Sequence, residues 1–303
     1  MVKENQLIIQ RREKLKNIRK KGIDPYASTF SKKNYASELL EKYNKLMGEE
    51  KSKEEAIVAG RIMTLRVMGK ATFAHIQDAT GKIQIYAKAD EIKKDNYDIF
   101  SKLDLGDIIG IKGYMFRTKK GELSIRVRHF QLLAKNLYPL PEKWHGLKDT
   151  EVRYRQRYID LIVNTDVKEI FLKRSKIISA MREFLVQHGF IEVETPILQP
   201  IYGGTNAKPF KSYLNDLKMD VYMRISNELY LKRLIVGGYE KIFEFSPDFR
   251  NEGIDATHNP EFLQMETMWA YADYKNNMDL TEELIEYVTK KVLGTTKFTY
   301  QGK

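Results

Sequence analysis

One short stretch combines a cation and a carboxylate at a spacing suited to a nucleotide, the Phe-Arg-x-Glu sequence that contains Arg250 and Glu252. A guanidinium is planar and permanently charged, so it can bind phosphate or carboxylate through two parallel hydrogen bonds. We expect residues 249–252 to form a strand, on which both side chains face the same side because side chains alternate along a strand. The pattern suits a site that stabilises charge on a phosphate. The alternative is a surface ion pair, which is the commoner role of an isolated Arg-x-Glu sequence.

Two acidic residues occur in largely apolar stretches. Glu228 begins the stretch ELYLKRLIV, and Glu266 lies in the second half of an apolar strand. A carboxylate in such a place is costly unless it is paired, so a ligand ammonium group is a reasonable partner for Glu266. The alternative is an ion pair with a neighbouring basic residue such as Lys232.

Several other kinds of chemistry are absent from the sequence. Gly69 and Lys70 lack a glycine five residues earlier, so they do not form a phosphate-binding P-loop, and no dinucleotide, zinc-protease or serine-hydrolase motif occurs. Cysteine is missing, which excludes disulfides, thiolate metal sites and cysteine nucleophiles. The histidines are scattered without metal-ligand spacing; they are His75, His129, His145, His188 and His258.

Composition favours two domains and a polyanionic partner. The chain has 303 residues, and its 52 Lys and Arg against 41 Asp and Glu give a net charge of +11. No run of 18 apolar residues occurs, and the start MVKENQLIIQRREKLK carries charges where a signal peptide is apolar. We therefore expect a cytoplasmic protein with no membrane segment.

The elements that position these residues fall into two parts. Residues 3–21 predict a basic amphipathic helix with Leu7, Ile8, Leu15 and Ile18 on one side, and residues 35–47 predict a second helix. Five β-rich runs follow between residues 56 and 133, with a helix inserted after the third. That order and size suit a five-stranded OB-type barrel, a fold that commonly binds oligonucleotides.

The second part predicts mixed helices and strands. A connector at 134–166 leads to a helix at 167–189 that Gly189 closes. We expect strands at 190–194, 219–225, 241–245, 249–252 and 262–272, and helices at 227–236 and 279–293. Strands that neighbour one another as hairpins favour an α+β domain with an antiparallel sheet.

Longer stretches resemble a known enzyme family. FLVQHGFIEVETPILQP at 184–200 is similar to motif 1 of class II aminoacyl-tRNA synthetases, and FEFSPDFRNEGIDATHNPEFLQMETMWAY at 243–271 is similar to motif 2. GGTNAKPF and RISNELYLKRLIVGGYEKIFE resemble the amino-acid pocket of the lysine-specific members. GRIMTLRVMGKATFAHIQDATGKIQIY resembles their anticodon-binding barrel, and HGLKDTEVRYRQRYIDLI resembles their connector.

The resemblance implies a domain order and an activity. The expected domains are an N-terminal helical extension (1–55), an OB-fold anticodon-binding domain (56–133), a connector (134–166) and the N-terminal part of the α+β catalytic domain (167–303). The implied function is a lysine–tRNA ligase, which uses ATP and Mg²⁺ to activate L-lysine to lysyl-adenylate and transfers it to tRNA(Lys). A homodimer formed through motif 1 is also implied.

The resemblance further implies site residues. The catalytic residue is Arg250. The residues expected to bind ATP are Arg250, Glu252, His258, Asn259 and Phe262, and those expected to bind lysine are Gly204, Glu228, Arg250, Glu266 and Met268. Those expected to bind the anticodon are Arg66, Phe73, Gln84 and Glu122, although Phe73 could instead belong to the barrel core.

The family pattern continues past motif 2 into motif 3, so we expect its magnesium ligands to lie beyond Lys303 and this chain to be inactive alone. Three positions depart from the pattern: Met268 stands in place of a pocket tyrosine, Asn227 in place of a proline, and Ser246-Pro247-Asp248 in place of a more polar or basic stretch. Two other functions stay open. One is a non-catalytic tRNA-binding fragment or regulatory paralogue. The other is an aspartyl- or asparaginyl-type synthetase, against which the acidic Glu228 and Glu266 argue.

Overall fold

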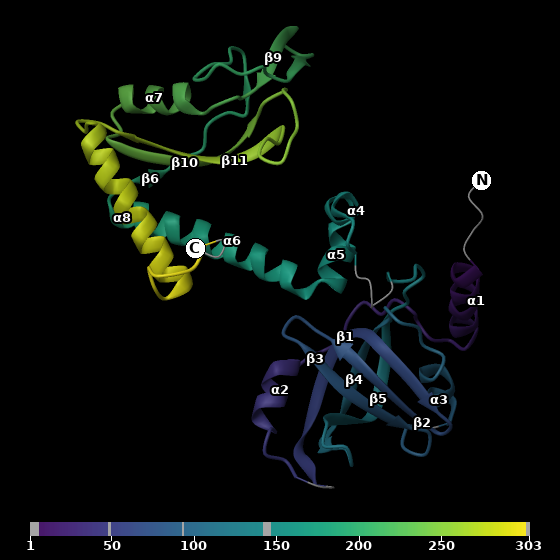
Figure 1. Ribbon diagram of the computed structural model, residues 1–303. Helices are drawn as coiled ribbons and strands as arrows, with labels where there is room; N and C mark the ends of the chain where they lie inside the picture. The colour runs from purple at the N-terminus through teal and green to yellow at the C-terminus, as the bar shows by residue number, and fades with distance from the viewer. Residues whose placement is uncertain (1–5, 48–49, 93, 142–146, 301–303) are drawn as a thin grey trace. The chain divides into compact units, whose positions relative to one another are not determined.

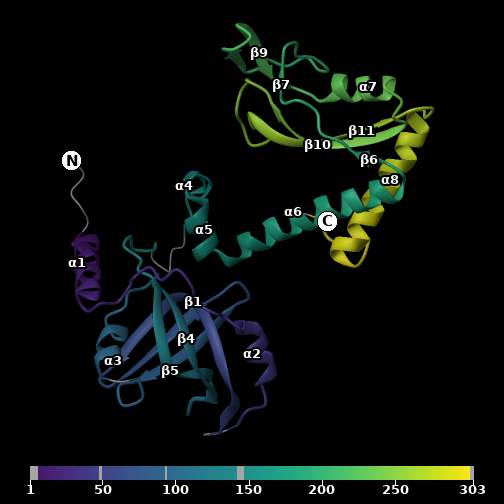
Figure 2. The same cartoon turned by 180° about the vertical axis from the view of Figure 1, so that it is seen from behind.

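The computed structural model describes residues 6–47, 50–92, 94–141 and 147–300. It divides into two compact units, Met1–Val163 and Asn164–Lys303 (Figures 1 and 2). None of the helices it describes is long and apolar enough to cross a membrane.

The first unit contains a closed five-stranded barrel with the strand order β1-β2-β3-β5-β4. The strands are β1 (Lys51–Met68), β2 (Ala71–Gln77), β3 (Lys82–Lys88), β4 (Ile108–Arg117) and β5 (Leu123–Ala134). Helix α3 (Lys94–Phe100) lies between the third and fourth strands along the chain. This arrangement confirms the predicted OB-fold, since a helix inserted between the third and fourth of five strands is what the sequence indicated.

On β2 and β3, side chains alternate between the barrel core and its outer face. On β2, Ala74 and Ile76 are buried, whereas Phe73 and His75 between and beside them are half-buried. The same period of two on β3 buries Ile83, Ile85 and Ala87. Phe73 therefore lies on the outer face of the barrel, and the alternative that it belongs to the core is wrong.

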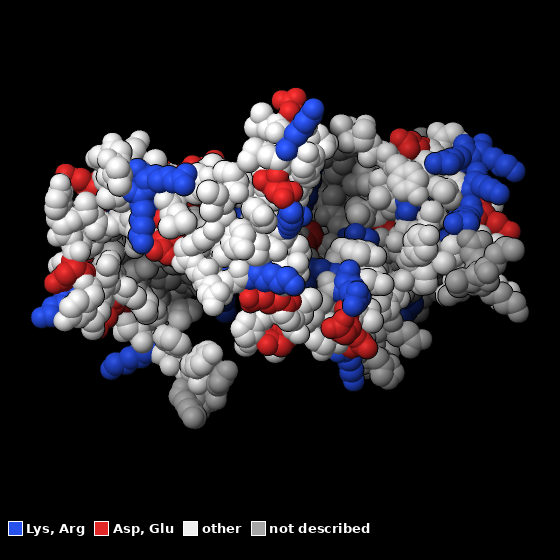
Figure 3. Space-filling view, turned by 90° about the horizontal axis from the view of Figure 1, so that it is seen from above, with Lys and Arg blue, Asp and Glu red and all other residues white. Residues whose placement is uncertain are grey.

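Helix α1 (Gln6–Lys20) attaches to the barrel mainly through charged side chains. Arg11 is buried and donates to the carbonyl oxygen of Tyr138 at 3.2 Å, and Lys14 Nζ lies 2.6 Å from Asp104 Oδ1. The predicted apolar side is therefore only partly right. Ile18 is buried, but Leu7 is 50% exposed. Lys and Arg side chains gather over α1 at the right of Figure 3.

Three short helices complete the first unit. Helix α2 (Ala36–Lys42) is shorter than the predicted 35–47. The connector contains α4 (Thr150–Arg155) and α5 (Arg157–Val163), and its residues 142–146 lie outside the described ranges. Asp160 is fully buried between these two helices, where it binds Arg153 at 2.9 Å and Arg157. The dense basic residues of the connector thus include partners for a buried carboxylate.

The second unit contains two small sheets with helices around them (Figure 1). The helices are α6 (Thr165–Gln187), α7 (Glu228–Val236) and α8 (Tyr274–Leu293). One sheet has the order β11-β10-β6, from β6 (Ile191–Glu192), β10 (Lys241–Phe249) and β11 (Glu261–Trp269). The other has the order β7-β9-β8, from β7 (Leu198–Gln199), β8 (Lys211–Leu214) and β9 (Met219–Met223). Among the described strand pairs of these two sheets, β6 and β10 are parallel and the others are antiparallel.

The β10–β11 hairpin has an apolar face and a polar face. Odd-numbered residues such as Phe243 and Met265 join the core formed with α6 and α8. Even-numbered residues face the other side, where α7 lies (Figures 1 and 2). Because paired residues of an antiparallel hairpin share a face, Glu244, Gln264 and Glu266 are presented together on that polar side.

Several element boundaries differ from the prediction, most of all at β10, β11 and α8. Strand β10 runs continuously to Phe249 and ends there, so residues 250–252 are not a strand and Arg250 and Glu252 are not presented by strand alternation. Strand β11 ends at Trp269. Helix α8 begins five residues before 279 because Asp273 accepts from the backbone N–H groups of Lys275 and Asn276 at 2.9 and 3.1 Å.

Candidate functional site

Glu266 occupies the centre of the polar hairpin face. Its Oε1 accepts hydrogen bonds from Gln264 at 2.6 Å and from Ser226 at 3.4 Å. Its Oε2 is buried and has no hydrogen-bond partner among the described residues. Burial raises the pKa of Glu266, and the nearby carboxylates of Asp248 and Glu228 raise it further. This carboxylate therefore lacks a cationic partner from the described chain.

Arg250 follows directly after β10 and remains anchored to the hairpin. Its backbone N–H donates to Pro260 at 2.9 Å, and its Nε donates to the carbonyl oxygen of Ile225 at 3.4 Å. The guanidinium lies 4.9 Å from the ring centre of Phe262. Stacking on an aromatic face leaves the N–H edges of a guanidinium available to a planar anion. The backbone bond and the ring contact thus replace the predicted strand as the means of orienting Arg250.

Gly204, Ser226 and Glu228 adjoin Glu266 from a different part of the chain. Gly204 has a φ of +93°, and a Cβ there would lie 2.9 Å from Ser226 Oγ and 3.1 Å from Glu228 Cβ. Only glycine satisfies both constraints. Ser226 Oγ accepts from the Glu228 backbone N–H at 3.1 Å, which leaves its own hydrogen for Glu266. Three predicted lysine-binding residues are thereby brought together.

Glu228 already has a partner within α7. Its carboxylate forms an ion pair with Lys232 one turn later, which is the alternative considered from the sequence. The side chain of Glu228 is 29% exposed, so this pair is partly solvated. Glu228 and Glu266 therefore differ in state, because the first is neutralised locally and the second is not.

A buried polar network lies beneath the site. The guanidinium of Arg224 is 2.8 Å from Glu244 and 3.2 Å from Asp248, and all three side chains are at most 3% exposed. Glu244 also accepts from Thr195 at 2.8 and 3.0 Å and from Asn227 at 3.0 Å. One arginine thus faces two buried carboxylates. Burial raises the pKa of Asp248 to about 6, which the charge of Arg224 opposes.

The other predicted ligand residues lie farther out. Met268 shares the face of Glu266, two positions along β11. Glu252 accepts from the backbone N–H of Lys208 at 3.2 Å, and His258 is exposed next to Asp255 at 2.8 Å. The exposed Asn259 donates to the carbonyl oxygen of Glu261. No hydrogen bond or ring contact joins these last three predicted ATP-binding residues to Glu266 within the part of the chain that is described.

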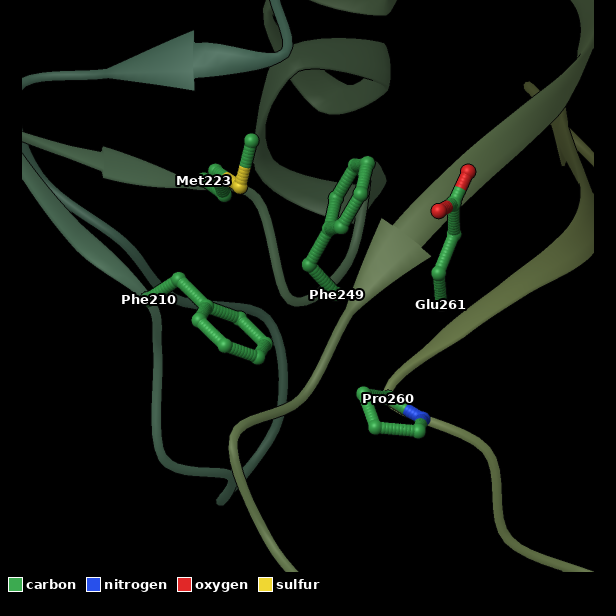
Figure 4. A pocket seen from close by; sticks show the side chains of 5 residues that line it. All are labelled: Phe210, Met223, Phe249, Pro260 and Glu261. Carbon is green, nitrogen blue, oxygen red and sulfur yellow. The ribbon is translucent and has the colours of Figure 1, made fainter. Parts of the chain in front are cut away.

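A small cavity of about 170 Å³ lies beside the end of the hairpin (Figure 4). Phe210, Met223, Phe249 and Pro260 line it, together with Glu261. Phe249 pairs with Glu261 in the odd-numbered register of the hairpin, which is opposite to the face of Glu266. The cavity therefore lies between the segment before β8 and the hairpin loop. It is separate from the face that carries Glu266.

The outer face of the barrel carries two rows of side chains in cross-strand register. The first row consists of Arg66, Phe73, Tyr86 and Arg126, with the rings of Phe73 and Tyr86 4.7 Å apart. The second row consists of Thr64, His75, Gln84 and Ser124, and Glu122 lies beside it. All four predicted anticodon-binding residues are thus on this outer face. An aromatic row next to a hydrogen-bonding row suits unpaired bases.

Sequence reasoning missed the side chains that support the predicted ones. In the barrel these are Thr64, His75, Tyr86, Ser124 and Arg126. In the second unit they are Thr195, Arg224, Ser226, Asn227, Glu244, Asp248 and Gln264. A period of two along each strand could have found His75, Tyr86 and Gln264, because each lies two positions from a predicted residue. No group of three or more His, Asp or Glu suited to a metal ion occurs in the described ranges, so we assign no magnesium ligand.

Comparisons with known proteins agree with these two units. Residues 149–301 match the family described as tRNA synthetases class II (D, K and N), and residues 56–133 match the OB-fold nucleic acid binding domain. The chain therefore belongs to the class II tRNA synthetase family, as the sequence resemblance indicated.

Among individual relatives, the chain is 54% identical to the "Lysine--tRNA ligase" of Carboxydothermus hydrogenoformans over 98% of its own length and 60% of that protein. It is 54% identical to the "Lysine--tRNA ligase" of Pelotomaculum thermopropionicum, covering 98% and 58%, and 53% identical to that of Halalkalibacterium halodurans, covering 98% and 60%. The chain thus spans about 60% of the length of these relatives.

Proposed function

We propose that this chain supplies the anticodon-binding and amino-acid-binding parts of a lysine–tRNA ligase, which activates L-lysine with ATP to lysyl-adenylate and transfers it to tRNA(Lys). The observation that carries the proposal is the Glu266 carboxylate. It is held on one oxygen by Gln264 and Ser226, while its other oxygen is buried without a partner in the described chain. A ligand ammonium group would complete it.

The charge of the surroundings favours a cationic amino acid. Asp248 and Glu228 both raise the pKa of Glu266, after burial itself, so the site carries more negative than positive charge near this carboxylate. The side chain of aspartate would add a further negative charge, and the side chain of asparagine would bring no cation. The carboxylates of Glu266, Asp248 and Glu228 therefore argue against the aspartyl- or asparaginyl-type alternative. Separation of lysine from a homologue one methylene shorter rests on pocket length, worth ~1–3 kcal/mol.

Arg250 is the residue that we assign to the reacting groups. Its guanidinium is fixed by Phe262 and Ile225, so it is oriented before any ligand arrives. A preorganised cation next to the α-phosphate and the attacking carboxylate stabilises the charge that develops between them. Glu252, His258 and Asn259 on the hairpin loop would then contact the nucleotide. Gly204 and Met268 would line the amino-acid pocket with Glu228.

The magnesium and ATP requirements of this family remain part of the proposal. ATP supplies the phosphate that is attacked, and Mg²⁺ supplies positive charge on the phosphates when bound. The residues of this chain contribute orientation and charge. Arg250 would bind the reacting carboxylate and phosphate. Glu266 would bind the ammonium group of the amino acid and so keep that group away from the reacting atoms.

The experiment compares two substitutions in a polypeptide that extends this chain to the full length of its relatives. Arg250→Ala should lower lysine-dependent pyrophosphate exchange by a factor of about 10²–10³, the effect of one oriented donor. Glu266→Gln should raise the lysine KM more than the ATP KM, because it removes the charge that meets the ammonium group. Asp216→Asn, on the β8–β9 turn, is the control.

The outcomes separate the candidate functions. Equal effects of Glu266→Gln on the two KM values would contradict the assignment of Glu266 to lysine. Anticodon stem-loop binding without exchange in the extended polypeptide would favour the runner-up, a non-catalytic tRNA-binding protein. That alternative draws support from the barrel, whose face of aromatic and hydrogen-bonding residues is formed without any contribution from the second unit.

We also propose a homodimer formed through motif 1 and helix α6, the helix that leads into it. Five apolar side chains of α6 are 39–64% exposed in this single chain; they are Ile170, Phe171, Leu172, Ile177 and Val186. Exposed apolar residues in such number on one helix favour burial against another surface. A second copy related by a twofold axis would present the same helix.

A further inference from the structure

We propose that Thr64 and His75 are positioning residues for base recognition, which hold the Glu122 carboxylate as a fixed hydrogen-bond acceptor for a ring N–H of an unpaired uracil or guanine. The proposal rests on the anticodon-binding function proposed above. Thr64 and His75 do not themselves contact the base. They act through Glu122, which does.

The barrel face places these residues side by side. Thr64 on β1, His75 on β2 and Gln84 on β3 are cross-strand neighbours, so their side chains project from the same face. Glu122 lies just before β5, next to Ser124, which is the register partner of Gln84. The row is therefore assembled from four strands, and the contacts that hold the Glu122 carboxylate come from His75 and Gln84, 47 and 38 positions away.

Thr64 and Glu122 together fix the tautomer of His75. A carboxylate only accepts hydrogen bonds, so His75 Nε2, 2.7 Å from Glu122 Oε1, must carry the hydrogen. In the neutral ring, Nδ1 is then an acceptor, and it lies 2.8 Å from Thr64 Oγ1. Thr64 Oγ1 in turn accepts from the His75 backbone N–H at 3.0 Å, which directs its own hydrogen to Nδ1. With a neutral ring, each hydrogen in the Thr64–His75–Glu122 chain of hydrogen bonds therefore has a single position.

The other end of the row holds the second carboxylate oxygen. Ser124 Oγ donates to Gln84 Oε1 at 2.8 Å, which turns the amide so that Gln84 Nε2 donates to Glu122 Oε2 at 2.5 Å. The Glu122 carboxylate thus accepts one hydrogen bond from the His75 imidazole and one from the Gln84 amide. Its side chain is nevertheless 47% exposed, so the remaining lone pairs are open to a ligand.

A base stacked on Phe73 comes within reach of this acceptor. Phe73 and His75 lie two positions apart on the same face of β2, a distance of about 7 Å. A stacked pyrimidine would therefore present its edge to Glu122. Uracil carries a hydrogen on N3, whereas cytosine of the same size has an acceptor there. A carboxylate fixed as an acceptor therefore accepts a hydrogen bond from uracil N3 and repels the lone pair on cytosine N3.

Without the grip of His75, Glu122 can turn away or change partners. A glutamate has three rotatable side-chain bonds, and an unrestrained one loses more freedom on meeting a base. We therefore expect substitutions at Thr64 and His75 to reduce discrimination between uracil and cytosine while leaving phosphate contacts, and hence general RNA affinity and its salt dependence, unchanged.

The test uses the 303-residue chain and an anticodon stem-loop with three uridines, which is compared with three variants that each carry one cytidine. Fluorescence anisotropy gives the four Kd values. We expect at least one position at which cytidine weakens binding about tenfold, which is about 1.4 kcal/mol. Thr64→Val removes the hydroxyl while keeping the shape and should abolish that preference. Thr64→Ser keeps the hydroxyl and should retain it, and His75→Phe should behave like Thr64→Val.

A direct measurement covers the case in which a variant fails to fold. Nitrogen chemical shifts of the His75 ring in the unsubstituted chain report which nitrogen carries the hydrogen. Hydrogen on Nε2 supports the inference, and hydrogen on Nδ1 alone overturns it. A chain that discriminates uracil from cytosine equally well with Thr64→Val also overturns it. A chain that binds no stem-loop at all contradicts the proposed anticodon function and this inference together.

Discussion

Asp248 provides a test of the charge balance beneath the candidate site. It is fully buried, it lies 3.2 Å from Arg224 Nε and 3.2 Å from Ser246 Oγ, and its Oδ2 has no partner in the described part of the chain. Burial raises its pKa to about 6 from 3.8, against the opposing charges of Arg224 and Arg250 and with that of Glu244. Asp248→Asn keeps the shape and an acceptor for Arg224, and it removes the titration.

The sign follows from the direction of the shift. The folded protein holds the Asp248 proton more tightly than the unfolded chain does, so the stability from this group is present below pH 3.8 and is lost as pH rises through about 6. Between about pH 5 and about pH 7.5 this group should lower the free energy of unfolding of the unsubstituted chain by roughly 1.4 kcal/mol. Asp248→Asn should lack that decrease.

Urea unfolding of the 303-residue chain and of Asp248→Asn at the two pH values gives the measurement. The comparison uses the change between pH values, so any constant effect of the substitution on packing cancels. Asp279→Asn, which removes an exposed carboxylate from α8, is the control and should follow the unsubstituted chain. The same pH dependence in Asp248→Asn and the unsubstituted chain would refute the reasoning, because it would mean that Asp248 is ionised throughout.

Three further outcomes are expected. Phe73→Ala should weaken binding of a lysine anticodon stem-loop by ~1–3 kcal/mol, the value of one lost stack, and an equal loss for mismatched loops would argue that Phe73 does not read bases. Lys20→Ala on the exposed side of α1 should lower affinity for all RNAs slightly and reduce the slope of log affinity against log salt by about one in a titration series; an unchanged slope would exclude a phosphate contact. Light scattering should show a dimer that Ile170→Glu weakens, and a monomer at all concentrations would contradict pairing through α6.

Local periodicity in the sequence was sufficient for much of the fold. The alternation along β2 and β3 predicts the barrel, because one face of each strand is buried and the pattern repeats every two residues. Phe73 and Gln84 were singled out by the family resemblance, and the structure, not the sequence, placed Phe73 outside the barrel core. The acidic Glu266 was identified because a carboxylate in an apolar strand requires a partner.

The sequence was less reliable where polar contacts replaced apolar ones. The apolar side predicted for helix α1 includes Leu7, which is 50% exposed, whereas Arg11 and Lys14 hold the helix through contacts with residues about 90 to 127 positions away. Strand β10 continues through Ser246 and Asp248, and on its buried polar face Arg224 from another segment pairs with Glu244 and Asp248. Periodicity of hydrophobic residues does not reveal such partners, since the stabilising groups lie on other elements.

The sequence by itself therefore determined the order of the strands along the chain and the carboxylate of the candidate pocket, because each depends on neighbours within a few positions. Only the tertiary structure decided which side chains hold them. Ser226 reaches Glu266 across 40 positions, and His75 reaches Glu122 across 47. Contacts at such separations depend on strand register and on the packing of whole elements, and these are fixed only when the entire unit has folded.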